Sequence, residues 1–195
     1  MMNFDAHGQR YNPYETTLSR SSVKNLQLAW KIDIGDTYSA PVVAGGILYV
    51  GSDDGHLYAR DAATGKPVWK VKAGKRINSA PAVAGGIVYV GTVDGNFLAY
   101  DAASGANVWS AHLDSPVCGS PTVSKGTVFV GAASGTLYAI DGHSGAVLWN
   151  TDRWAAGNTN APAVVNGVVY SENTEGQTVA YDAVHGTKLW EQTTS

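Results

Sequence analysis

The sequence predicts an all-β protein built from repeated four-stranded antiparallel blades. An eleven-residue motif, Ala-x-Asp-x-x-x-Gly-x-x-x-Trp, occurs in four copies at steps of 40, 40 and 41 residues in a chain of 195. Three short apolar runs, separated by Gly-containing turns, accompany each copy. A period of about 40 residues with four strands per unit is typical of a β-propeller. The copies span residues 59–69, 99–109, 139–149 and 180–190.

The strands of the first unit set the pattern for the other three. The first strand is predicted at 39–44 (SAPVVA), the second at 47–52 (ILYVGS) and the third at 56–61 (HLYARD), and the fourth, outer strand carries Trp69. The second strands are nearly continuous apolar runs, which predicts that both of their faces are buried between stacked blades. The four predicted blades cover residues 38–73, 78–113, 118–152 and 159–193.

Explicit turn signals join these strands. Pairs such as Gly45-Gly46 link the first strand to the second, and pairs such as Asp54-Gly55 link the second to the third. Gly supplies the positive φ that tight hairpin turns require. Strands of this length joined by such turns predict an antiparallel meander.

The motif itself predicts how blades are joined. Its Asp can accept backbone N–H groups in the turn after the third strand, and its Gly lets the chain reverse. We expect each Trp to lie flat between adjacent blades, where an indole buries roughly 150–250 Å². The predicted docking residues are Trp30, Trp69, Trp109, Trp149 and Trp190.

The start of the chain differs from the repeats. Residues 1–27 predict an irregular N-terminal arm, in which Ser19 and Ser22 ahead of Val23 favour a short helical turn. Residues 28–35 predict one outer strand, carrying Trp30, of an incomplete blade. Five tryptophan strands against four complete sets of inner strands predict an open part of a larger ring. A four-bladed ring and the pairing of two chains into one ring are the alternatives.

The phrase SAPVVAGGILYVGSDDGHLYARDAATG and the motif spacing resemble the PQQ-like β-propeller repeat of quinoprotein alcohol dehydrogenases. The resemblance covers about residues 28–195, and the arm GQRYNPYETTLSRSSVKNLQLAW is similar to the entry segment of secreted members. It implies a ring of seven or eight blades and a periplasmic or secreted protein, although no signal peptide is expected in the polar start of this chain.

Composition excludes some classes of function. The net charge is −3, the pI is about 5.9 and the 13 basic residues are scattered, which disfavours nucleic acid as a partner. Cys118 is the single cysteine, so no intrachain disulfide can form. No apolar run approaches the roughly 18 residues of a transmembrane segment.

The connections between blades carry the candidate contacts for a ligand or partner. They should share one face with the turns between second and third strands, and they vary where the strands do not. Arg together with Trp at such a rim is typical of a recognition hot spot, although Trp154 could equally cover the end of a blade. The candidate residues are Arg76, Asn78, Arg153, Trp154, Asn158 and Asn160.

A quinone site is the alternative that the resemblance implies. Related enzymes surround the quinone with adjacent cysteines, a carboxylate base and a calcium ion held by Glu and Asn. Adjacent cysteines cannot occur here, and only Glu172 and Asn173 resemble a cation pair. A tolerated turn variation explains that pair better.

The sequence therefore predicts a non-catalytic propeller scaffold or binding module, with a protein, a peptide or a small carbohydrate as its ligand. No cofactor is expected for it, and further blades or a second chain should complete the ring. Its nearest functional analogue by resemblance is the propeller lipoprotein that helps assemble outer-membrane β-barrels. The alternative is a fragment of a quinoprotein alcohol dehydrogenase, for which PQQ and calcium would be the cofactors.

Overall fold

The predicted all-β propeller architecture is confirmed by the computed structural model, which describes residues 18–152, 157, 160–173 and 175–193. Within these residues four antiparallel sheets follow one another, each of four strands in sequence order. We name them blade 1 (β1–β4), blade 2 (β5–β8), blade 3 (β9–β12) and blade 4 (β13–β16). The strands are β1 Val42–Ala44, β2 Ile47–Gly51, β3 His56–Asp61, β4 Pro67–Lys72, β5 Ala82–Ala84, β6 Ile87–Gly91, β7 Asn96–Asp101, β8 Asn107–His112, β9 Thr122–Ser124, β10 Thr127–Gly131, β11 Leu137–Asp141, β12 Val147–Asn150, β13 Ala163–Val165, β14 Val168–Glu172, β15 Gln177–Asp182 and β16 Lys188–Thr193.

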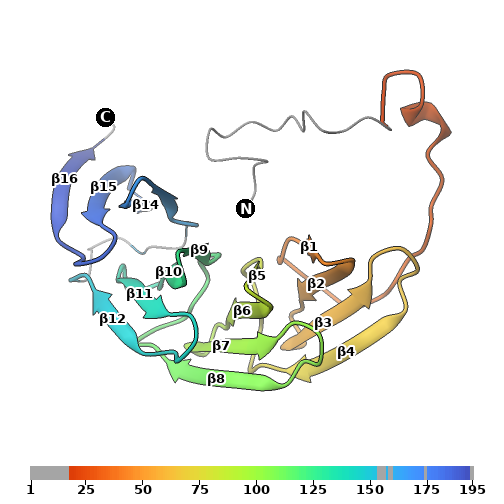
Figure 1. Ribbon diagram of the computed structural model, residues 1–195, viewed down its shortest axis with the longest axis horizontal. Coiled ribbons are helices and arrows are strands. Elements are labelled where there is room, and N and C mark those ends of the chain that lie inside the picture. Colours follow the sequence, from red (N-terminus) through yellow and green to blue (C-terminus); the bar gives the residue numbers. More distant parts are fainter. Residues whose placement is uncertain (1–17, 153–156, 158–159, 174, 194–195) are drawn as a thin grey trace.

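The blades stand side by side in an open arc (Figure 1). Their first strands meet along the inside of the arc, where β1 contacts β5, β5 contacts β9 and β9 contacts β13. Their fourth strands lie along the outside. The core consists of side chains between neighbouring blades, such as Tyr49, Leu57 and Val88 between blades 1 and 2.

Local residue choice explains the hairpins. In the turn between β1 and β2, Gly45 has φ of 56° and Gly46 has φ of 77°, as a two-residue turn with both central residues left-handed requires. Lys125 and Asn166 take the same conformation in blades 3 and 4 and are the non-Gly residues with positive φ in the described part of the chain. The first strands are shorter than predicted because ladder pairing begins only after the proline, at Val42 in blade 1.

A repeated contact joins each blade to the next. The indole Nε1 of Trp69 donates to the Ala102 carbonyl oxygen at 2.9 Å, and that of Trp109 donates to the Gly142 carbonyl oxygen at 2.8 Å. The ring lies against the motif Gly, since a Cβ on Gly105 would stand only 2.8 Å from Trp69 Cδ2. Trp149 makes the same bond to Ala183 at 3.2 Å, whereas Trp190 at the end of the arc is 45% exposed.

A second close contact between neighbouring blades is present in blades 1 and 2, and blade 4 differs from them at the same position. A Cβ on Gly51 would stand 2.2 Å from Ile77 Cγ2, and one on Gly91 would stand 2.4 Å from Val117 Cγ1. The connection that enters the next blade therefore places an aliphatic side chain against the ends of β2 and β6. At the corresponding position of β14 the chain has Glu172 instead.

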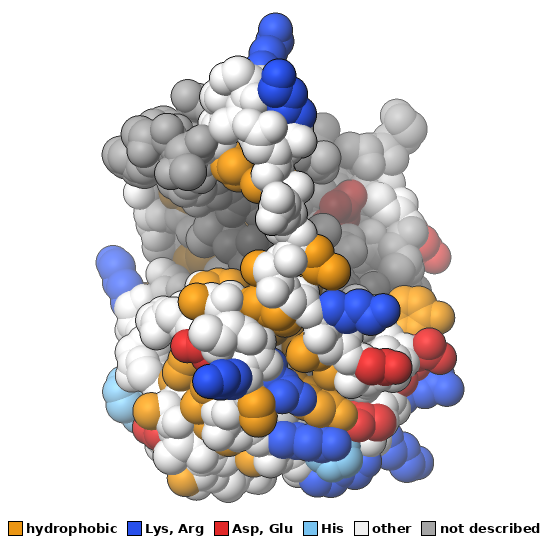
Figure 2. Space-filling view, turned by 90° about the vertical axis from the view of Figure 1, so that its right-hand side faces the viewer, with side chains coloured by type: hydrophobic (Ala, Val, Ile, Leu, Met, Phe, Trp, Pro, Cys, Tyr) orange, Lys and Arg blue, Asp and Glu red, His pale blue; other side chains and the backbone are white. Residues whose placement is uncertain are grey.

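Residues 28–35 differ from the prediction of an outer strand, because no sheet strand is assigned to them. A strand needs a neighbour for its backbone bonds, and within the described residues none lies beside this segment. It still docks on blade 1, where Trp30 Nε1 donates to the Ala62 carbonyl oxygen at 3.0 Å. Figure 2 looks onto this side of blade 1, where apolar, basic and acidic side chains are mixed on the surface. The expected helical turn ahead of it is the 3₁₀ turn η1, Val23–Asn25.

Candidate functional site

The connections between blades share one face with the turns between second and third strands. The connection from β4 to β5 bonds to the hairpin of blade 1 through Ile77 N–H and the Ser52 carbonyl oxygen at 3.1 Å. It also accepts a bond from the hairpin of blade 2, from Val93 N–H to the Arg76 carbonyl oxygen at 3.0 Å. We call this side the loop face. The β4–β5 connection is thus held between two hairpins, which fixes the backbone beneath any ligand bound there.

A groove of about 610 Å³ lies on the loop face between the hairpins of blades 1 and 2. Carboxylate and amide groups come from the β2–β3 hairpin and the β4–β5 connection, and three basic side chains come from the end of β4 and the same connection. The lining residues are Asp53, Asp54, Lys72, Gly74, Lys75, Arg76, Asn78 and Val93.

Two oxygen atoms within this lining are buried without a hydrogen-bond donor. They are Asp53 Oδ1 and Asn78 Oδ1. A buried acceptor left unpaired costs about 1–3 kcal/mol, so an enclosed water would be favourable at each. The Arg76 guanidinium leaves Asp53 only partly paired, because the Arg76 side chain is exposed and its Nε lies 3.8 Å from Asp53 Oδ2.

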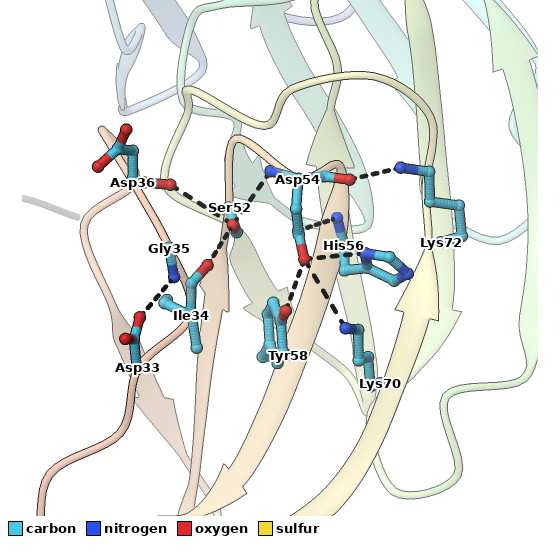
Figure 3. A network of polar contacts seen from close by, with 10 residues as sticks. All are labelled: Asp33, Ile34, Gly35, Asp36, Ser52, Asp54, His56, Tyr58, Lys70 and Lys72. Atoms are coloured by element: carbon cyan, nitrogen blue, oxygen red, sulfur yellow. Dashed lines mark hydrogen bonds and ion pairs between the residues drawn. The ribbon is translucent and has the colours of Figure 1, made fainter.

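Asp54 is fixed by its own chain (Figure 3). Its Oδ2 accepts the Tyr58 hydroxyl at 2.6 Å and lies 3.1 Å from His56 Nδ1, while Lys72 Nζ donates to its carbonyl oxygen. Burial alone would raise the pKa of Asp54, but hydrogen bonds from Tyr58, the His56 backbone and Ser52, together with the His56 charge, outweigh it and lower the pKa. Asp54 therefore lines the groove as an ionised carboxylate that its own hairpin and the neighbouring strand hold in place.

The structure brings two of the predicted contact residues to this groove. Arg76 is exposed and Asn78 is half-buried in the same connection. Asn160 is exposed on the corresponding connection into blade 4 and does not line the groove. The candidates Arg153, Trp154 and Asn158 lie outside the described residues.

The predicted cation pair lies at the end of blade 4. Glu172 is exposed at the end of β14, whereas Asn173 is buried in the turn that follows. The Asn173 amide oxygen accepts the backbone N–H groups of Glu175 at 3.0 Å and Gln177 at 2.9 Å. These bonds stabilise the hairpin, which is the behaviour of the turn variation that we preferred from the sequence. No group of three or more His, Cys, Asp or Glu side chains placed to hold a metal ion was found in the part of the chain that the structure describes.

The sequence did not indicate the polar network around Asp54. A signal was present, because blade 1 has His56, Tyr58 and Lys70 where blade 2 has Asn96, Leu98 and Ser110. The substitution is informative only once the third and fourth strands are known to be paired, with Tyr58 opposite Lys70. Lys70 Nζ then stands 4.6 Å from the centre of the Tyr58 ring and 3.7 Å from Asp54 Oδ2.

The lone thiol offers little reactivity. Cys118 lies half-buried in the connection from β8 to β9, and burial raises the pKa of its thiol above the ordinary value. Among the described residues that line the groove there is no Ser, Cys or His that could form a nucleophile and base pair. The groove therefore offers hydrogen-bonding and charged groups for binding.

Comparison with protein families gives one match that runs along most of the chain. The model described as outer membrane protein assembly factor BamB matches residues 14–118 and 100–195. Among curated proteins, lupanine 17-hydroxylase [cytochrome c] of Pseudomonas sp. is 41% identical over 64 residues, which is 31% of this chain and 9% of that protein. The dehydrogenase subunit of the quinone alcohol dehydrogenase of Gluconacetobacter polyoxogenes is 39% identical over 64 residues, again 31% of this chain and 8% of that protein.

Solved structures show the same fold. The quinohemoprotein alcohol dehydrogenase ADHIIG of Pseudomonas putida HK5 matches with a TM-score of 0.84 and 22% identity over 97% of this chain. BamB of Moraxella catarrhalis matches with a TM-score of 0.60 and 24% identity over 76% of this chain. The chain spans 39% of the former and 61% of the latter, so it corresponds to part of each. No helix among the described residues is long and apolar enough to cross a membrane.

Proposed function

This chain belongs to the PQQ-like β-propeller family, and from that premise we propose that it is a non-catalytic binding propeller whose loop face contacts a protein partner. The observation that carries the proposal is the groove between blades 1 and 2 on the loop face, which is lined by carboxylate, amide and basic side chains. Family membership supports a periplasmic or secreted location, and we propose that further blades or a second chain complete the ring.

An extended peptide segment suits the chemistry of this groove. Backbone N–H groups of such a segment would donate to the accessible oxygens of the carboxylate groups that line the groove, and its carbonyl or carboxylate oxygens would meet Lys75 and Arg76 at the rim. A peptide offers both kinds of group at short, regular spacing, as in other modes of peptide recognition. The rigid backbone beneath the groove limits the entropy that binding would cost.

Site-directed photo-crosslinking tests this function. A photoreactive side chain at position 78 should give a discrete protein adduct in the cells that make this protein. The same group at position 125, in the turn at the opposite ends of the strands, should not give that adduct. Arg76→Ala should weaken the crosslink at position 78 without changing the thermal midpoint of the protein. Equal adducts from both positions, or none from position 78, would show that the loop face does not bind a protein.

The competing function is that of a quinoprotein dehydrogenase fragment, favoured by the curated relatives and by the dehydrogenase fold. The residues of this chain do not fit the quinone and calcium. Its one thiol, Cys118, has no second cysteine beside it, and the amide oxygen of Asn173 already accepts two bonds from its own hairpin. We therefore propose no cofactor for these residues. Dye reduction with alcohols after adding quinone and calcium separates the two functions, because quinone-dependent turnover would favour the enzyme.

A further inference from the structure

A second groove, of about 400 Å³, lies between blades 3 and 4. Its walls come from the outer strands β12 and β16, which follow one another along the outside of the arc, and from β15 (Figure 1). It has no residue in common with the loop-face groove between blades 1 and 2. Sites for small molecules measure about 300–1,000 Å³, so this groove has room for a small ligand.

The blade 3 wall opens because its outer strand ends early. β12 has four residues, whereas β4, β8 and β16 have six each. Thr151 stands where blades 1 and 2 have Val71 and Ala111. Its hydroxyl accepts the Leu137 N–H at 3.0 Å, in place of the backbone carbonyl that would continue the ladder. The next residue, Asp152, therefore leaves the sheet, and its exposed carboxylate lines the groove.

The blade 4 wall holds a carboxylate in a fixed position. Gln177 Nε2 donates to Glu191 Oε1, and Lys188 Nζ donates to Glu191 Oε2 at 2.7 Å. Gln177 is held in turn, because its amide oxygen accepts the Asn173 side-chain amide at 3.1 Å. A carboxylate has about four acceptor sites, so both oxygens of Glu191 can accept a further bond from a ligand. Side chains already held in place lose less entropy when a ligand binds.

The lining is polar on both sides of the groove. In the described part of the chain neither the exposed Asn150 amide nor the exposed Asp152 carboxylate has a protein partner. The Tyr181 ring is only 4% exposed, so the described lining offers little apolar surface. Two carboxylates face a single ammonium group, which disfavours an anionic ligand. The matching ligand donates and accepts hydrogen bonds over its whole surface and carries no negative charge.

We propose that this groove binds a neutral saccharide. Neighbouring hydroxyl groups of a sugar ring donate to the carboxylates of Asp152 and Glu191, and their oxygens accept from Asn150 and Lys188. A peptide suits the groove less well, because the lining has little apolar surface for its side chains. The inference goes beyond the loop-face function and does not depend on it.

Nuclear magnetic resonance of the whole chain with neutral trisaccharides tests the site. The probes are maltotriose, cellotriose and mannotriose at millimolar concentration. At least one of them should shift the side-chain amide signals of Asn150 and Gln177 and the backbone amide signals of residues 188–191, and these shifts should saturate. The matched anionic probe, trigalacturonate, should bind about tenfold more weakly or not at all, because the two carboxylates repel it.

Protein variants test the two walls separately. Glu191→Gln and Asp152→Asn each keep the size of the side chain and remove its charge, so each should weaken saccharide binding about tenfold. The matched control is Glu172→Gln, which changes an exposed carboxylate at the end of β14 outside the groove and should bind as the parent chain does. Thermal midpoints equal to that of the parent chain show that the variants are folded.

Three results would overturn the proposal. They are the absence of shifts with all three neutral trisaccharides, equal binding of trigalacturonate, and unchanged affinity in both Glu191→Gln and Asp152→Asn. Shifts confined to residues 53–54 and 75–78 would place the saccharide on the loop face and would overturn it equally.

Discussion

Replacing the most enclosed docking tryptophan should reveal how much the blade contacts contribute to stability. Trp109 is 8% exposed, and its indole N–H donates to the Gly142 carbonyl oxygen at 2.8 Å. The centre of its ring lies 6.0 Å from that of Tyr89 and 5.8 Å from that of Phe97. Trp109→Ala removes an indole and leaves a cavity that the surrounding side chains cannot fill. Such a change lowers the free energy of unfolding by about 3–5 kcal/mol in a core. For a chain of this size, 1 kcal/mol shifts the melting temperature by about 2–4 °C, so a decrease of roughly 6–20 °C is expected.

The chain provides the matched control for this measurement. Trp190 has the same motif position but is 45% exposed, and no indole bond to a following blade is present for it among the described residues. Trp190→Ala should therefore lower the unfolding free energy by about 1 kcal/mol or less. Trp109→Phe keeps most of the bulk and should lose about 1 kcal/mol for the hydrogen bond beyond its packing loss. Thermal unfolding followed by circular dichroism measures all three. Equal melting temperatures for Trp109→Ala and Trp190→Ala would refute docking as the source of stability.

Three further outcomes are expected. Gly145→Ala should lower the melting temperature more than Gly85→Ala. Both residues have positive φ, but only a Cβ at position 145 would meet a neighbour, 2.7 Å from Trp109 Cδ2. Equal decreases in thermal melts of the two variants would show that backbone strain alone causes the loss. Hydrogen bonds from Thr64 lower the pKa of Asp61, so its stabilisation is complete above the ordinary pKa of about 3.9 and is lost as the pH falls below it; melts at a series of pH values should show Asp61→Asn with a shallower acid slope than the parent chain. Because burial raises the pKa of the Cys118 thiol, its alkylation by iodoacetamide should follow a pH midpoint above that of a free cysteine, and a midpoint below it would contradict the buried placement.

Much of the fold could be predicted because the same pattern of turns, apolar strands and tryptophans recurs in four repeats. Periodic Gly turns and apolar second strands determine where the blades begin and end, and Trp at a fixed distance from the turn Gly identifies the outer strands. Residues 28–35 were harder, since their sequence favours a strand while a strand also requires a neighbour. Local pattern cannot show whether that neighbour is present, so the segment is docked but unpaired.

The site was less predictable than the fold. Arg76 and Asn78 were suggested by their place in a variable connection, and the structure puts both on the groove between blades 1 and 2. The contribution of Asp53 depends on which atoms are buried and which donors reach them, and this is set by packing between two hairpins that are distant in sequence. The anchoring of Asp54 by Tyr58 likewise depends on a third strand pairing with a fourth.

The close approach at the ends of β2 and β6 also limits how such a chain can be rearranged by duplication. Blades 1 and 2 accept a following blade because Gly51 and Gly91 leave space for Ile77 and Val117. A copy of blade 4 inserted between them would bring Glu172 against an aliphatic side chain, with a carboxylate forced from water. Gene-level shuffling of these modules would therefore be tolerated for blades 1 and 2 and penalised for blade 4. A single residue position thus distinguishes blade 4 from blades 1 and 2, separately from the motif that makes the blades look alike.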